Sequence, residues 1–173
     1  MSSNATPFRR IQLRTLRGAA LALLALGAAA CDDDDENGED EPEIARVQLT
    51  VTPPTGAAQQ YVLGTNAATN PAVVFRVGTN RVSAVALDAN NQTIDLESDF
   101  EVRVVQSVTV QGANEVENAL PAGVTFTANG TTTNATLAVT AASATERPAV
   151  VRMFHRGEGH SDFDAGIRYT VAP

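Results

Sequence analysis

The sequence predicts an all-β domain over residues 44–173, built as an antiparallel sandwich of two sheets. Short runs of residues alternate between apolar and polar with the two-residue period of a half-buried strand. Clusters of Gly, Asn, Pro and Asp separate these runs, and no long window has the 3.6-residue period of a capped helix. We expect a helical signal peptide over residues 1–30 and a disordered acidic linker over residues 31–43 to precede the domain. The length of 173 residues suits one ordinary domain with such additions.

The first thirty residues are typical of an export signal. They contain four arginines and no acid, and a run of thirteen small or apolar residues, 18–30, ends the segment. This run is shorter than the about 20 residues that a membrane-spanning helix needs. It also has no polar face, which argues against a helix packed on the domain. A twin-arginine route is a second interpretation of Arg9 and Arg10, but their neighbours favour the general secretory route.

The end of the apolar run carries the only cysteine of the chain. The sequence Ala28-Ala29-Ala30-Cys31 resembles the lipobox of bacterial lipoproteins, although Ala28 stands where the family usually has leucine. The resemblance implies that Cys31 is acylated on sulfur and becomes the new N-terminus. Two or three acyl chains would hold the protein on a membrane without spanning it. The expected location is therefore the cell envelope, on either the periplasmic or the surface side.

An acidic segment follows the cysteine. Nine of the twelve residues 32–43 are Asp or Glu, and none is basic. Such a segment has little apolar surface to bury and repels itself, so we expect a disordered spacer. A flexible polyacid would bind Ca²⁺ only weakly, because no rigid cage fixes the ligands.

The remaining residues predict a series of short strands. Residues 45–52 place Ala45, Val47, Leu49 and Val51 on one face, and Pro53 and Pro54 end the run. Further strands are expected over residues 61–63, 72–77, 81–87, 100–105, 108–110, 124–128, 135–140, 149–155 and 167–171.

Two stretches resemble bacterial immunoglobulin-like domains. Residues 82–94 are similar to a strand, turn and strand of these modules, and residues 120–127 with 135–140 are similar to their late hairpin. The resemblance implies an immunoglobulin-like fold and a structural or adhesion-like role with another envelope protein as partner. The chain lacks the cysteine pair and core tryptophan of antibody-type domains.

Composition argues against several classes of function. The chain has 12 basic and 20 acidic residues, a net charge of -8, which disfavours nucleic acid as a partner. One cysteine excludes an internal disulfide, a four-thiolate zinc site and a CxxC redox pair. The run 159–163 fails the nucleophile-elbow pattern because Phe163 stands where glycine is required. We therefore expect no enzymatic activity.

Two polar clusters were weighed as metal sites. The acids and amides between Asp88 and Asp99 lack the glycine of a calcium loop, and a hairpin turn explains them better. The second cluster holds both histidines of the chain together with three acids, namely His155, Glu158, His160, Asp162 and Asp164. If strands 149–155 and 163–171 form a hairpin, these side chains can converge on Zn²⁺ or Cu²⁺, with water as a further ligand.

Two interpretations of function remain open at this point. The first is a lipid-anchored, non-catalytic envelope protein with a structural or protein-interaction role. The alternative is a Zn²⁺- or Cu²⁺-binding envelope lipoprotein that uses the loop from His155 to Asp164. A polar loop turned by Gly157 and Gly159, with no metal, is the simpler interpretation of the same residues.

Overall fold

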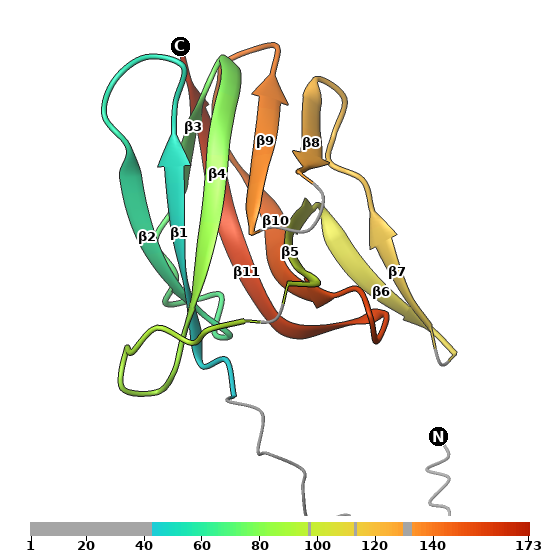
Figure 1. Cartoon of the computed structure of the whole chain (residues 1–173). Helices are drawn as coiled ribbons and strands as arrows, with labels where there is room; N and C mark the ends of the chain where they lie inside the picture. The colour runs from blue at the N-terminus through green and yellow to red at the C-terminus, as the bar shows by residue number, and fades with distance from the viewer. Residues whose placement is uncertain (1–42, 97, 113, 130–132) are drawn as a thin grey trace, which may run out of the picture. The chain divides into compact units, whose positions relative to one another are not determined.

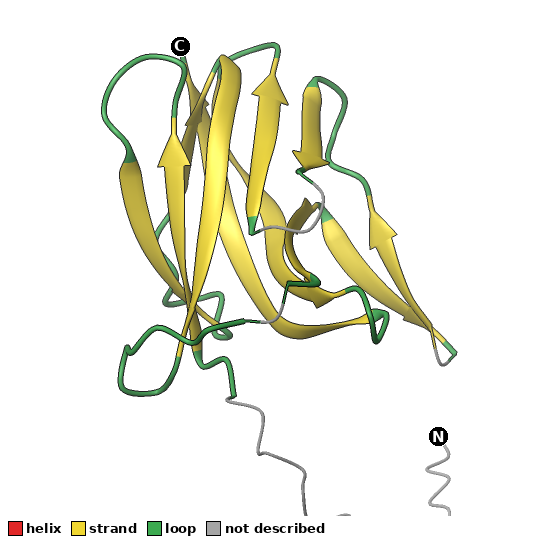
Figure 2. Ribbon diagram, in the orientation of Figure 1, coloured by secondary structure: helices red, strands yellow, loops and turns green. Residues whose placement is uncertain are grey.

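The computed structural model of the chain describes residues 43–96, 98–112, 114–129 and 133–173. The predicted signal peptide, Cys31 and all of the acidic linker except Glu43 lie outside the described residues. The described part consists of strands and loops (Figure 2), which confirms the all-β prediction. No helix in this part is long and apolar enough to cross a membrane. The strands, labelled in Figure 1, are β1 (Arg46–Thr52), β2 (Gln59–Gly64), β3 (Val73–Arg76), β4 (Gly78–Leu87), β5 (Phe100–Val105), β6 (Ser107–Gln111), β7 (Asn114–Asn118), β8 (Val124–Ala128), β9 (Asn134–Val139), β10 (Ser143–His155) and β11 (His160–Ala172).

The larger sheet has five strands in the order β2-β1-β4-β9-β8, all antiparallel. Strand β1 shows why the alternation is a reliable signal, because Val47, Leu49 and Val51 are at most 1% exposed while the residues between them are not buried. Strands β8 and β9 form the expected late hairpin. This sheet supplies one face of the core (Figure 1).

The second sheet has four strands in the order β3-β11-β10-β5. Its centre is the long hairpin of β10 and β11, with thirteen residues in each strand. The expectation of purely antiparallel pairing was wrong here, because β3 runs parallel to the end of β11, with Val73 opposite Tyr169. Parallel neighbours cannot be joined by a tight turn, and these two are far apart in the chain.

A third, two-stranded sheet was not expected. Strands β6 and β7 form a hairpin of their own beside the two larger sheets (Figure 1). Strand β7 reads Asn-Glu-Val-Glu-Asn and has almost no apolar residues to reveal it. Its Glu117 forms ion pairs with Arg152 of β10, at 2.8 Å, and with Arg103 of β5, at 3.3 Å. Charge pairing therefore holds this hairpin against the outer face of the four-stranded sheet.

Aliphatic side chains fill the core between the two larger sheets. Val, Leu, Ile and Ala make up most of the buried residues. The buried aromatic side chains are Phe75, Phe100, Phe163 and Tyr169, and Phe75 meets Tyr169 edge to face at 5.7 Å. Close packing of such side chains fixes the hairpin of β10 and β11, and with it the position of the turn that joins them.

The stretch considered as a calcium loop is a turn. Asp88 Oδ1 accepts hydrogen bonds from the backbone N–H groups of Asn90, at 2.8 Å, and Gln92, at 2.7 Å. Asn91 has a φ of 63°, which asparagine tolerates in turns. The chain returns with an isolated bridge between Leu87 and Thr93, so the second strand that was expected in residues 82–94 is not formed.

Candidate metal centre

The two histidines lie opposite each other at the end of the β10–β11 hairpin. His155 is the last residue of β10, and His160, which was expected in the loop, is instead the first residue of β11 and pairs with it. The turn between them is closed by a hydrogen bond of 2.8 Å from the N–H of Gly159 to the carbonyl of His155. Gly159 has a φ of 77°, a conformation that favours glycine. The predicted hairpin is thus confirmed.

The imidazole of His155 is buried and held on two sides. Only 5% of the residue is exposed, and Phe100, its partner across β5 and β10, stacks on the ring with centroids 4.5 Å apart and planes 16° apart. Its Nε2 lies 3.0 Å from Asp99 Oδ2. The stacking on Phe100 fixes the plane of the ring. The carboxylate of Asp99 fixes the rotation of the ring in that plane, with Nε2 toward Asp99.

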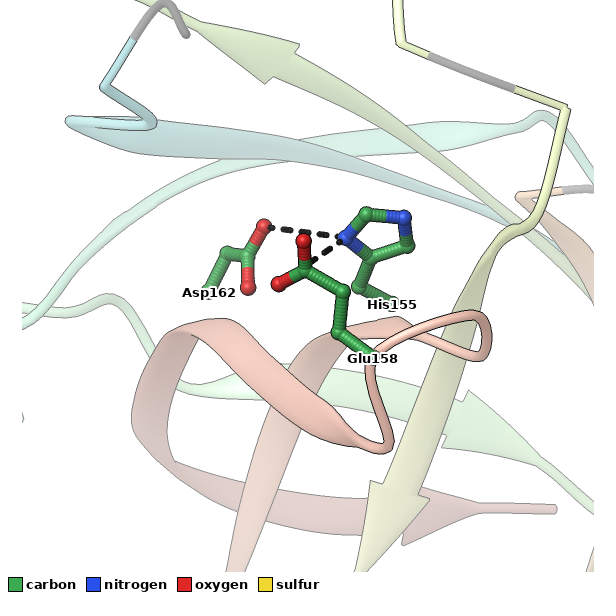
Figure 3. A group of neighbouring side chains, drawn as sticks. All are labelled: His155, Glu158 and Asp162. Carbon is green, nitrogen blue, oxygen red and sulfur yellow. Dashed lines mark ion pairs between the residues drawn. The ribbon is translucent and has the colours of Figure 1, made fainter. Parts of the chain in front are cut away.

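The other nitrogen of His155 has no hydrogen-bond partner. Nδ1 is buried and lies 3.6 Å from Glu158 Oε2 and 3.9 Å from Asp162 Oδ2 (Figure 3). Both distances exceed those of a hydrogen bond. A buried polar atom without a partner costs about 1–3 kcal/mol. The nitrogen is therefore directed at two carboxylates without bonding to either.

These three side chains can offer one ligand atom each, and the three atoms lie within 4.8 Å of one another. Ligands of a tetrahedral zinc ion with bonds of about 2.0–2.1 Å are about 3.3 Å apart. The measured separations of 3.6 and 3.9 Å from Nδ1 are slightly larger. Glu158, whose side chain is 49% exposed, has the freedom to move toward an ion. Together His155, Glu158 and Asp162 are the three-residue site.

His160 lies next to this site. Its Nε2 is 3.2 Å from Glu158 Oε2 and 2.9 Å from Asp162 Oδ1, and its ring centroid is 6.4 Å from that of His155. The side chain is 55% exposed, so it can rotate at low cost. His160 is thus placed to serve as the fourth ligand, in a set of two imidazoles and two carboxylates.

A β-bulge brings Asp162 into the site. Met153 pairs with Phe163 and Phe154 pairs with Ser161, which leaves Asp162 as the extra residue of β11. In an unbroken strand Asp162 and Asp164 would lie on the same face. The bulge breaks that alternation and lets the carboxylate of Asp162 face the two histidines.

Asp164, the remaining acid of the predicted set, does not join this group and has other partners. Its Oδ1 accepts hydrogen bonds from Arg152 Nε, at 2.8 Å, and from Ser161 Oγ, at 2.7 Å. Arg152 is 1% exposed and also pairs with Glu115 and Glu117 of the β6–β7 hairpin. Burial acts to lower the pKa of Arg152, but the hydrogen bonds to Asp164 and Glu115 outweigh it and raise that pKa above its ordinary value. Asp164 therefore belongs to this structural ion cluster.

The structure adds one residue that the sequence did not reveal as part of this site. Asp99 is separated from His155 by 56 positions and reaches it only because β5 pairs with β10. In the sequence it was visible only as the last acid of the calcium-like stretch. The residues near Asp99 in the sequence do not indicate that β5 pairs with β10, which lies far along the chain.

Imidazole nitrogens combined with carboxylate oxygens suit Zn²⁺ or Cu²⁺ better than Ca²⁺ or Mg²⁺, which prefer oxygen ligands alone.

No protein-family model matches the chain, and no curated protein and no solved structure matches it.

Proposed function

We propose that this chain is a lipid-anchored envelope protein whose β domain binds a transition-metal ion, Zn²⁺ or Cu²⁺, through His155, Glu158 and Asp162. The observation that carries the proposal is the buried Nδ1 of His155, which has no partner and is directed at two carboxylates. A metal ion placed among these atoms would satisfy the nitrogen. Two carboxylates would also balance the charge of a divalent ion.

The buried surroundings favour a specific site over loose attraction of cations. The imidazole is fixed by Phe100 and Asp99 before any ion arrives. A preorganised ligand costs less ordering on binding than one on a flexible chain. This distinguishes the three-residue site from the acidic segment 32–43, which offers charge but no imidazole.

The membrane anchor is proposed from sequence. It is supported by the lipobox-like residues before Cys31 and by the acidic spacer that follows. An immunoglobulin-like sandwich is likewise the proposed description of the domain. It is supported by the two facing sheets and by the hairpin of β8 and β9.

A non-catalytic protein-interaction role is the second candidate function. The β6–β7 hairpin projects beside the sheets (Figure 1), and Val110 near its tip is 74% exposed. Burial of Val110 in a contact with another envelope protein would remove apolar surface from water. This role is compatible with metal binding at the other hairpin.

Calorimetric titration with ZnCl₂ and CuCl₂ tests the proposed function. The full chain with Cys31→Ser is used, because a free thiol would compete for the metal. We expect one ion per chain with micromolar or tighter affinity, and Glu158→Gln should weaken binding at least about tenfold. Glu146→Gln is the matched control, since Glu146 is 47% exposed and far from the site in the β10–β11 register. Absence of binding by the parent chain would refute the proposal.

A further inference from the structure

Asp99 contacts three consecutive residues at the end of β10 and the start of the turn that follows it. Its Oδ2 is 3.0 Å from His155 Nε2 and accepts a hydrogen bond of 3.1 Å from the N–H of Gly157. Its backbone carbonyl accepts hydrogen bonds from the N–H and the Nε of Arg156, at 3.2 and 3.3 Å. The residue thus sets the position of the imidazole and of the turn that carries Glu158.

An ionised carboxylate only accepts hydrogen bonds, so the proton of a neutral His155 must be on Nε2. Nδ1 then carries the lone pair, and this is the atom that faces Glu158 and Asp162. A carboxylate that fixes the tautomer of a histidine ligand is a recurring partner in metal sites and also increases the basicity of the ligand.

The close approach of the Asp99 carboxylate to the turn depends on a glycine. A Cβ on Gly157 would lie 2.5 Å from Asp99 Oδ2, closer than real contacts allow. The backbone of residue 157 can approach the carboxylate only because it is glycine. A side chain at position 157 would therefore push the carboxylate of Asp99 away from the turn.

We propose that Asp99 is the positioning residue of the metal site, which presents Nδ1 of His155 as the ligand by accepting a hydrogen bond from the N–H at Nε2. The expected effect of Asp99 on metal affinity rests on the proposed function. The effect of Asp99 on the tautomer of His155 is measurable in the metal-free protein. Loss of such a partner lowers metal affinity by about 10–100-fold.

The test compares the full Cys31→Ser chain with the same chain carrying Asp99→Asn. Nitrogen-15 NMR of the imidazoles, at a pH where they are neutral, reports which nitrogen holds the proton. The parent should show His155 with the proton on Nε2. In the variant an amide can donate to Nε2, so part of the population should carry the proton on Nδ1, and zinc affinity should fall by about 10–100-fold. The control Asp95→Asn, an exposed change four residues earlier, should leave both readouts unchanged.

A second variant covers the case in which Asp99→Asn does not fold. Gly157→Ala keeps every ligand residue but puts a Cβ 2.5 Å from the position of Asp99 Oδ2, so the carboxylate must shift, and zinc binding should also weaken by about tenfold. Unchanged affinity and tautomer in a folded Asp99→Asn chain, or an Nδ1–H tautomer in the parent, would overturn the inference while leaving zinc binding intact. If the parent shows the Nε2–H tautomer but binds no zinc, the proposed function fails and the orienting role of Asp99 stands.

Discussion

Arg152 Nε donates a hydrogen bond of 2.8 Å to Asp164 Oδ1 across the β10–β11 hairpin, on the face opposite His155. The two aspartates of the segment 162–164 therefore have different partners. Asp164 neutralises a buried guanidinium, whereas Asp162, displaced by the bulge, faces His155 and His160. The predictions below follow from this division.

Replacing Arg152 should destabilise the fold. Arg152→Met removes the cation that three carboxylates share. These carboxylates are 26–45% exposed and can be hydrated, so we expect the free energy of unfolding to fall by about 1.5–3 kcal/mol, the range for hydrogen bonds to charged groups. Urea unfolding measures the change. Arg168→Met is the control, because Arg168 and Glu146 are about half exposed and their pair should contribute less than about 1 kcal/mol. Equal losses in both variants would contradict the role of Arg152.

The contribution of Arg152 should not depend on pH between pH 7 and 10. A raised pKa in the folded state gives stability that is fully present below the unfolded pKa and is lost only as pH rises through the folded one. Both values lie above this range. The difference in unfolding free energy between the parent and Arg152→Met should therefore stay constant from neutral to mildly alkaline pH, and a loss there would count against the account.

The two neighbouring aspartates should differ in their effect on metal binding. Asp162→Asn removes a ligand and should weaken zinc binding at least about tenfold, whereas Asp164→Asn should change it less than about twofold. Competition with a zinc-sensitive dye measures both. Thermal unfolding of each metal-free variant shows whether a loss comes from misfolding. The reverse order of effects would mean that the bulge does not place Asp162 as described.

Zinc should stabilise the domain in proportion to its occupancy. At a free concentration one hundred times the Kd, binding adds about 2.7 kcal/mol to the free energy of unfolding. Calorimetric melting should show a higher Tm with zinc, returning to the metal-free value after EDTA. A chain with His155→Gln should show no zinc-dependent rise. A rise of equal size in that variant would mean that the ion binds elsewhere.

The anchor proposal depends on one side chain. Cys31→Ser removes the thiol that would be acylated, so the protein should move from the membrane fraction to the soluble fraction of its host. Fractionation followed by immunoblotting measures the change. A variant that still sediments with lipid would show that the attachment does not depend on Cys31.

Much of the fold could be predicted because its signals are local. The alternation in β1 buries one face of that strand, and the apolar runs of β5 and β8 give their boundaries. The β10–β11 hairpin was also predictable, since both arms are apolar and glycines lie between them. These features alone predict that His155 and His160 lie close together.

The remaining features depend on contacts that sequence periodicity does not contain. Strand β7 is held by ion pairs, and β3 joins β11 from far along the chain. Ideal alternation puts Asp162 and Asp164 on one face, and only the bulge separates them. Asp99 reaches His155 through the pairing of β5 with β10, so its role required the structure.

In the proposed site, Nδ1 of His155 binds the metal ion. Nitrogen-15 NMR of the imidazoles during titration of the Cys31→Ser chain with ZnCl₂ observes this nitrogen itself. We predict that the Nδ1 signal of His155 moves to the range of zinc-bound nitrogen at one equivalent, while Nε2 keeps its proton. An Nδ1 signal that stays unchanged at saturating zinc would contradict the account.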